Sequence, residues 1–442
     1  MWATARDEHH GNGAQAPRLP IGENMINPRT IANRFHGDSL RVFELAAVVF
    51  LWQAAVGVYF LSLVQQYLPQ QLHSGAAFPG YAMAAYGVAK FAWQPAAGWI
   101  ADRAGRRITM VAGMALSVPV LVLMMEVPDE RAFLSLSAVL GIGAATMWPA
   151  FMAHVGDSTP HGRRVRTMTL LNLAQMCGIG AGTLAGVLMV DFVTYGAAFW
   201  MCIGFSMLAL AMVVRSVPHH DATQPPSPVG AAGMAQASAA ATASIPPWTP
   251  GIAMLAVIVL FLTVGTSLHT PMIGAYTHDV LRVKMSFMAM LFPLPALVAG
   301  VAMWRLRKLE ERYGRHVPLI GGLFVASLSI FALTLTRSPF IAVNLVVLAG
   351  LAYAISIPAW GAAALDATDV GSRGLWLGAL SAVQGLGVAG GQALGGVIGG
   401  VWGPLAPFKL AALLLMVALA LIVTHQLVQS RRSPALIAIR TG

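Results

Sequence analysis

Hydrophobic residues fall in long blocks along this chain, and polar residues gather in the short stretches between them. A helix needs roughly 20 mostly apolar residues to cross a bilayer. The blocks have that length and lie at about 42–66, 77–100, 107–126, 132–156, 166–190, 196–215, 250–275, 285–305, 317–336, 339–364, 375–399 and 404–428. The pattern therefore predicts an all-α polytopic membrane protein with twelve transmembrane helices.

Composition supports a membrane protein and excludes a soluble enzyme. Only 10% of the residues are charged, against about 25% in soluble proteins, and the mean hydropathy is +0.70. The net charge of +10 could suggest nucleic-acid binding, but membrane proteins collect Lys and Arg in cytoplasmic loops. We expect no nucleic-acid partner, no enzymatic activity, no cofactor and no metal. Without a Walker-type phosphate loop, direct drive by ATP is not expected.

The polar stretches divide the chain into halves and set its orientation. Residues 216–248 are rich in Pro, Ala and Ser and predict a disordered linker between two six-helix bundles, 42–215 and 249–428. The tails, 1–41 and 429–442, are expected to be cytoplasmic, and the first is expected to be flexible. With both termini and the linker on one side, that side holds most of the 27 Lys and Arg residues. The positive-inside rule then predicts a plasma (inner) membrane protein with both termini in the cytoplasm.

The two halves repeat each other at one constant offset of 209 residues. The matched pairs include acids, arginines, glutamines and glycines: Asp102–Glu311, Arg103–Arg312, Gly105–Gly314, Arg106–Arg315, Asp157–Asp366, Arg164–Arg373, Gln175–Gln384 and Gly182–Gly391. No gap is needed across three helices. Parallel repeats related by an axis along the membrane normal are a transporter architecture. The sequence thus predicts two pseudo-symmetric bundles.

Two motifs carry a resemblance to a known family. The turn at 98–107 reads G-x-x-x-D-R-x-G-R-R, and Asp157-x6-Arg164 after the fourth segment recurs as Asp366-x6-Arg373. In these motifs the chain resembles the major facilitator superfamily over essentially all of 42–428. The resemblance implies alternating access by two rocking bundles. It also implies a central cavity lined mainly by helices one, four, seven and ten.

Charged turns at the cytoplasmic ends of the helices are candidate gate residues. Charge-assisted pairs across the bundles would hold this gate shut and would break when it opens. Gly105 has a separate reason, since a tight turn often needs a positive φ. The alternative is that the arginines only fix the topology. The candidates are Asp102, Gly105, Arg106, Asp157, Arg164, Glu311, Arg312, Arg315, Asp366 and Arg373.

Lys90 is the one ionisable residue deep within the first half. It lies 12 residues before Asp102, about 18 Å from the cytoplasmic edge at 1.5 Å per residue. Tyr86 and Gln94 flank it at helical spacing. An intramembrane charge is by default a functional-site hypothesis, here a cationic contact for an anionic substrate. The alternative is a structural lysine bonded to helix carbonyls.

Further polar groups within the segments are candidates for the substrate cavity. They are Gln53, Tyr59 and Gln65 in the first segment, Asn172 and Gln175 in the fifth, His269 in the seventh, Tyr353 and Trp360 in the tenth, and Gln384 in the eleventh. Each could instead join helices to one another. His269 could also take a coupling proton, because its unperturbed pKa is near neutral.

Acidic residues are missing from the middle of every segment. A site for lipophilic cations usually needs an acid to offset desolvation. We therefore expect a monomeric secondary transporter, surrounded by lipid, that moves a small organic solute, anionic or neutral. Coupling to a proton is left open, and symport is one form it could take.

Three alternative functions are a multidrug efflux proton antiporter, a non-transporting receptor or scaffold, and a lipid translocase. The antiporters carry a Gly-Pro motif in helix five, whereas Thr183 follows the central glycine here. This departure counts against the first alternative.

Overall fold

The computed structural model of the chain describes residues 28–126, 129–159, 164–217, 250–291, 316–366 and 373–432. No strand occurs within these ranges, and helices fill nearly all of them. The described residues from Glu44 onward belong to one compact unit. The prediction of an all-α protein is therefore confirmed.

The first half of the chain contains six long helices. They are α1 (Pro28–Val58), α3 (Phe78–Ala104), α4 (Arg106–Glu126), α5 (Glu130–Ser158), α6 (Arg164–Phe192) and α7 (Tyr195–Ser216). Helix α1 continues through a π-helical stretch, Tyr59–Tyr67, into the short α2 (Leu68–Gln71). It begins at Pro28, earlier than the predicted 42, because proline is well suited to the first turn of a helix and polar residues can continue one.

The second half repeats this order. It contains α9 (Pro250–Leu268), a 3-10 turn (Thr270–Met272), α10 (Ile273–Ala275), a π-helical turn (Tyr276–Val280), α11 (Met285–Leu291), α13 (His316–Leu333), α14 (Pro339–Asp366), α15 (Arg373–Trp402) and α16 (Ala406–Arg432). Each of the twelve predicted segments coincides with a helix, except that the eighth is described only as far as Leu291. The linker from 218 to 248 lies outside the described residues.

Seven of the described helical spans are long and apolar enough to cross a membrane. Helices α3 and α15 are not among these seven, because glycine and polar residues lower their mean hydropathy. These two helices pack against each other and so join the two halves. Twelve membrane-spanning helices are consistent with this arrangement.

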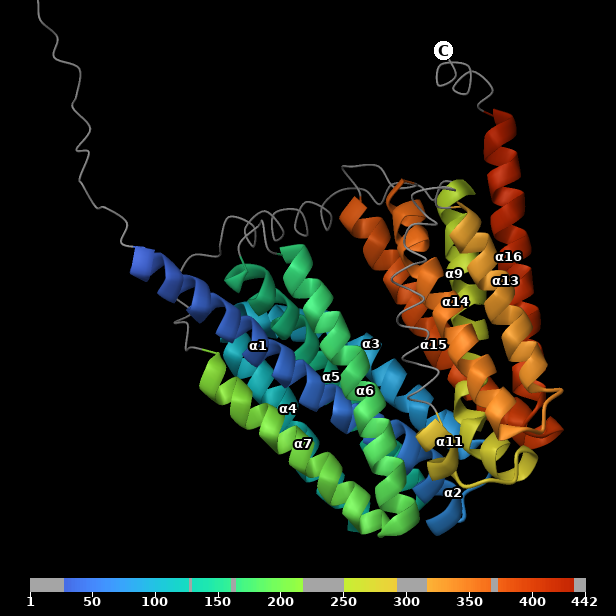
Figure 1. Cartoon of the computed structure of the whole chain (residues 1–442), viewed down its shortest axis with the longest axis horizontal. Helices are drawn as coiled ribbons and strands as arrows, with labels where there is room; N and C mark the ends of the chain where they lie inside the picture. Colours follow the sequence, from blue (N-terminus) through green and yellow to red (C-terminus); the bar gives the residue numbers. More distant parts are fainter. Residues whose placement is uncertain are drawn as a thin grey trace, which may run out of the picture. The chain divides into compact units, whose positions relative to one another are not determined.

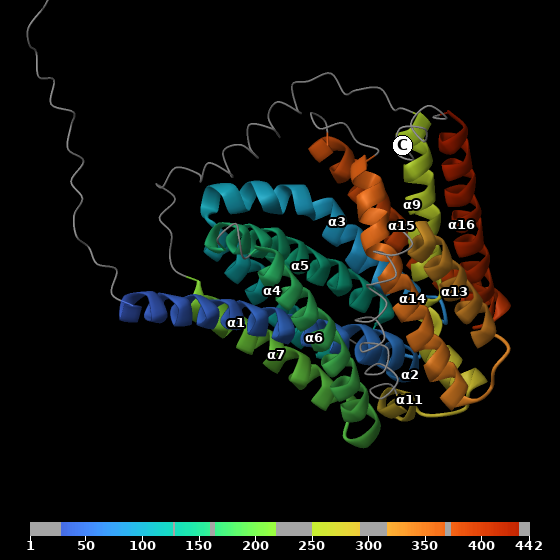
Figure 2. The same ribbon diagram turned by 45° about the horizontal axis from the view of Figure 1, so that its top comes forward.

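Each half has its own hydrophobic core. In the first half, α4 packs on α5 and α7, and α3 packs on α5, around a cluster that runs from Leu45 to Val217. In the second, α13 packs on α14 and α16, and α16 packs on α9, around a cluster from Ile258 to Ile422 (Figures 1 and 2).

The structure repeats itself at the predicted offset. A Cβ atom on Gly113 of α4 would meet Gly143 and Met147 of α5, and one on Gly322 of α13 would meet the equivalent Ala352 and Ser356 of α14. His73 and Arg282, also equivalent, are the only described non-glycine residues with positive φ, at 49° and 57°. The repeat therefore extends beyond the region where sequence identity shows it.

Candidate functional site

Helices α3 and α15 approach closely along one side of α3. A Cβ atom on Gly80 would lie 2.5 Å from the carbonyl oxygen of Gln392, and one on Gly87 would lie 3.3 Å from the Ala389 side chain. Farther along, the Phe91 ring covers Gly385 of α15. Glycine lets the two backbones approach to this distance. One face of α3 is thereby fixed against the second half.

Another side of α3 contacts α5 of its own half. The indole Nε1 of Trp93 donates a hydrogen bond to Thr146 Oγ1 at 3.1 Å, and the backbone of Tyr86 lies against Gly141. At 100° per residue, Lys90 lies between Tyr86 and Gly87 around the helix, about 40° from Tyr86 and about 60° from Gly87. Lys90 therefore occupies the sector of α3 between the α5 contact and the α15 contact.

Gln94 shares this sector with Lys90, one turn nearer Gly105. Both side chains are half-buried, which fits a position beside the seam between the halves. Tyr86, one turn to the other side, is buried and packs on Tyr59 at 5.9 Å between ring centroids. Phe60 contacts the same ring of Tyr86 at 5.0 Å. Tyr86, Lys90 and Gln94 thus follow one another along one side of α3, and Tyr59 packs on the first of them.

The candidates on α1 and α6 differ in their burial, and Gln53 lies where these two helices pack. Gln53 is buried, and its Cβ would be 3.1 Å from a Cβ on Gly178. Gln175 is half-buried, and Asn172 is exposed. Gln384 of α15, the equivalent of Gln175, is also exposed. Exposure of this kind fits a helix face that borders either lipid or the space between the halves.

In the second half, His269 lies between α9 and α16. Its ring centroid is 5.3 Å from that of Phe408, and its Nδ1 has no hydrogen-bond partner within the described ranges. Tyr353 of α14 is half-buried near Thr266 of α9. The Trp360 side chain lies outside the described residues. His269 and Tyr353 are therefore placed on the second half alone, apart from the Lys90 group.

The turn at Gly105, within the gate motif, has the predicted conformation. Gly105 separates α3 from α4 with φ 91°, and its carbonyl accepts from both the backbone N and Oγ1 of Thr109. Arg107 Nη2 donates to the Val214 carbonyl near the end of α7 at 2.6 Å, which ties two helices of the first half together. The expectation that Gly105 needs a positive φ is confirmed.

Most of the other gate candidates fall outside the part of the chain that the structure describes. Arg106 is half-buried at the start of α4. The side chains of Asp102, Asp157, Arg164, Asp366 and Arg373, and the whole of Glu311, Arg312 and Arg315, lie outside the described residues. Their gating role stays a prediction.

Direct contacts between the halves also occur at the helix ends opposite Gly105. Gln65 Nε2 donates to the Thr270 carbonyl at 3.0 Å, and Gly274 N donates to Gln65 Oε1 at 2.8 Å. Asp191 Oδ2 accepts from Ser286 N at 2.9 Å. The sequence analysis places Gln65 among the cavity groups and does not single out Asp191. It misses the contacts of both residues, because their partners are backbone atoms that no sequence motif marks.

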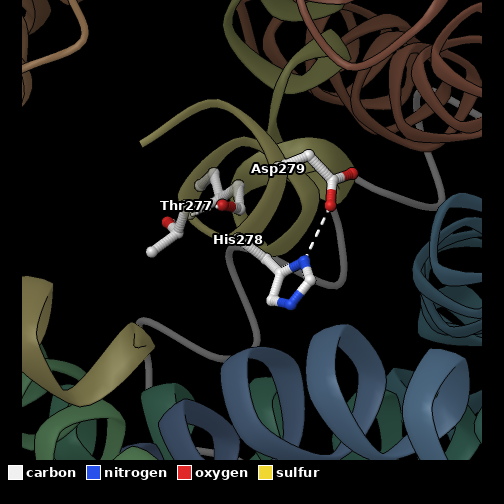
Figure 3. A network of polar contacts seen from close by, with 4 residues as sticks. Thr277, His278 and Asp279 are labelled. Atoms are coloured by element: carbon white, nitrogen blue, oxygen red, sulfur yellow. Dashed lines mark hydrogen bonds and ion pairs between the residues drawn. The ribbon is translucent and has the colours of Figure 1, made fainter. Parts of the chain in front are cut away.

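The nearby pair His278 and Asp279 has a different character. Figure 3 shows the His278 ring beside the Asp279 carboxylate. The distance from Nδ1 to Oδ1 is 2.7 Å. The two side chains are 79% and 56% exposed, so this contact adds little stability. No cluster of three or more His, Cys, Asp or Glu side chains that could hold a metal occurs within the described ranges.

Comparison with known proteins identifies the fold and the family. The family model described as Major Facilitator Superfamily matches residues 45–346 and 308–438. A structure of a nucleoside transporter NupG mutant has a TM-score of 0.69 at 12% identity, covering 87% of this chain and 99% of that one. The human organic anion transporter MFSD10 has a TM-score of 0.59 at 17% identity, with the same two coverages.

Two curated relatives match part of the chain. The MFS-type transporter YhjO of Bacillus subtilis (strain 168) is 26% identical over 36% of this chain and 40% of its own length. The multidrug resistance protein MdtL of Escherichia coli O9:H4 (strain HS) is 26% identical over 41% of this chain and 45% of its own length. The match thus spans less than half of either relative. On the extent of the family-model match, the chain belongs to the Major Facilitator Superfamily.

Proposed function

We propose that the protein is a secondary active transporter that moves a small organic solute, anionic or neutral, across the plasma membrane by alternating access. Membership of a transporter family supports transport as the general activity. The bundles would be 42–215 and 249–428, joined by the cytoplasmic linker, with both termini in the cytoplasm. The charged turns that begin at Asp102 and Glu311 would form the cytoplasmic gate.

The position of Lys90 is the observation that carries the choice of substrate. It lies near the middle of α3 and half-buried, in the sector between the α5 and α15 contacts. A charge at this depth is costly unless it meets a partner or a hydrated space. An anionic solute between the halves would supply that partner. Gln94, from the same sector, would add a hydrogen-bonding group to the same substrate.

The remaining candidates would line the cavity on either side of this group. Gln53, Tyr59, Tyr86, Asn172 and Gln175 would contribute from the first half. His269, Tyr353, Trp360 and Gln384 would contribute from the second. His269 is our candidate carrier for a coupling proton, because an imidazole can exchange a proton near neutral pH.

Transport into proteoliposomes tests the role of Lys90. We would measure uptake of a panel of small carboxylates and neutral sugars by wild type, Lys90→Met and Lys90→Arg. Met keeps the length and removes the charge. For a transported carboxylate we expect Lys90→Met to raise KM at least tenfold, which corresponds to about 1.4 kcal/mol, and Lys90→Arg to retain most activity. Lys409→Met, which removes an exposed lysine of α16, is the matched control.

If Lys90→Met transports the carboxylate as wild type does, the lysine is structural and our choice of an anion is wrong. Monodisperse elution of the variant in size-exclusion chromatography is required before its flux is interpreted. A second outcome is that only a neutral sugar is transported and that Lys90→Met leaves its uptake unchanged. The lysine would then be structural, and the protein would still be a transporter.

Multidrug efflux is the second candidate, and the similarity to MdtL favours it. The two candidates differ in the charge that the cavity accepts. Proton-driven export of cationic dyes from everted vesicles, undiminished in Lys90→Met, would support efflux of cations over our proposal. We expect no such export, because a lysine beside the seam repels a cation.

A further inference from the structure

At the helix ends opposite Gly105, the two halves touch through a pair of residues that are equivalent in the repeat. Gln65 and Gly274 are 209 residues apart and bond directly to each other. Equivalent positions can touch only where the pseudo-twofold axis passes between them. The contact also has no room for a second side chain, because a Cβ on Gly274 would lie 2.8 Å from the Gln65 carbonyl oxygen.

Gln65 uses both ends of its side-chain amide across this axis. Its Nε2 donates to the Thr270 carbonyl and its Oε1 accepts from Gly274 N. Helix α9 ends at Leu268, and a 3-10 turn with Pro271 follows. A broken helix leaves backbone groups that a side chain can satisfy within a membrane. The Gln65 side chain is buried there, and both of its hydrogen bonds are at least partly buried.

The contact of α6 with α11 is a second link, and its symmetry mate lacks the side chain. Asp191 Oδ2 accepts from Ser286 N. The equivalent positions are Gly400 and Ala77. A Cβ on Gly400 would lie 3.6 Å from Ala77 N, so the same backbone approach exists without a carboxylate. Close glycine packing, as at Gly80 against Gly396, holds α3 to α15 instead.

We propose that Gln65 and Asp191 keep the outer gate closed, as two polar side chains of the first half bonded to the backbone of the second half. The second half supplies glycine at both equivalent positions, so the control of this gate is one-sided. The proposal rests on the alternating access proposed above, but it is tested without substrate or flux. Unchanged distances in the measurements below would therefore leave the transport function standing.

Distances across the outer ends test the proposal directly. Spin labels at Val193→Cys and Leu335→Cys, both exposed, report on the two halves in a Cys177→Ser/Cys202→Ala background. We expect Gln65→Ala to add a longer distance and to raise the ratio of open to closed gate about 25-fold, about fivefold for each of the two hydrogen bonds lost. Gln66→Ala is the control, since Gln66 is the adjacent buried glutamine, with no partner in the described part of the chain.

Asp191 provides two further variants that separate bonding from folding. Asp191→Asn keeps an acceptor for Ser286 N and should retain the parental distances, whereas Asp191→Ala should shift them toward the open gate. Gly400→Asp places a carboxylate beside Ala77 N and should reduce the open fraction below that of the parent. If Gln65→Ala and Gln66→Ala give the same distances, and Asp191→Ala matches Asp191→Asn, the proposal is overturned.

Discussion

The two halves of the chain share a backbone plan but differ in the side chains they bring to their common boundary. Tyr67 packs on Phe199 with ring centroids 5.0 Å apart, and the equivalent Tyr276 packs on Phe408 at the same 5.0 Å. At the boundary, by contrast, Gln65 and Asp191 of the first half bond to the backbone of the second, and the residues equivalent to them in the second half are both glycines, Gly274 and Gly400.

This difference indicates which positions the repeat uses for packing and which have diverged for function. Positions that keep small or aromatic residues in both halves lie inside a bundle, where shape decides stability. Positions that have diverged lie between the bundles, where Lys90, Gln65 and Asp191 are all contributed by the first half. Among the described residues, the first half therefore supplies these three polar side chains at the boundary, and the second supplies closely packed glycines such as Gly274 and Gly396.

The largest expected effect comes from filling the glycine contacts within each half. A Cβ on Gly182 of α6 would lie 2.5 Å from Ala54 Cα, which belongs to the backbone of α1 and cannot move aside. At the equivalent Gly391 of α15, the closest obstacle is the hydroxyl of Ser267, which can rotate. We expect Gly182→Val to cost about 3 kcal/mol of stability and Gly391→Val about half of that.

Thermal unfolding in detergent, followed by thiol-reactive dye or intrinsic fluorescence, measures this pair of variants. Gly180→Val is the matched control on α6, because nothing lies within 4 Å of a Cβ at that position. Equal losses at Gly182 and Gly391 would mean that the two halves are packed alike. A loss at Gly180 as large as that at Gly182 would show that helix propensity, and not packing, decides the effect.

Much of the fold can be predicted from the sequence, because membrane insertion sets a length and a polarity that can be counted. The repeat is visible for the same reason, since glycines such as Gly182 and Gly391 keep their spacing. The start of α1 at Pro28 is not predicted, because residues 28–41 are too polar to give a hydropathy signal.

The boundary between the halves is harder to predict. Lys90 stands out because a buried charge is rare, and the structure places it beside Gln94 as its spacing suggests. Gln65 and Asp191 cannot be assigned to partners from the sequence, because their partners are backbone N–H and C=O groups, which nearly every residue carries. Only the break in the helix after Leu268 shows which of those groups are available.

A smaller difference between the halves is expected at the two matched tyrosines. Tyr276 OH donates to the Leu333 carbonyl at 2.8 Å in a buried setting, whereas no hydrogen bond to Tyr67 OH occurs in the described ranges. Tyr276→Phe should therefore cost about 1 kcal/mol, and Tyr67→Phe about 0.3 kcal/mol or less. The thermal midpoints of the two variants, each compared with that of wild type, measure this difference in stability. A larger loss in Tyr67→Phe would contradict the assignment of the bond.

The last expected effect concerns Arg107, whose equivalent in the second half is His316. Arg107 Nη2 bonds to the Val214 carbonyl near the end of α7, where a cation also meets the negative end of the helix. The contact is exposed, so Arg107→Ala should lower the free energy of unfolding by only about 0.5 kcal/mol. Arg107→Lys should recover part of that loss, since a lysine keeps the charge but lacks the fixed geometry of the guanidinium.

The reciprocal variant, His316→Arg, shows whether the second half can still form this contact. It would bring the same side chain to α13, where the equivalent carbonyl belongs to Val423 of α16. A rise in the thermal midpoint of His316→Arg, alongside the fall in Arg107→Ala, would show that the second half has kept the backbone geometry of this contact while losing its side chain. A fall in both would show that the ends of α13 and α16 have diverged from those of α4 and α7.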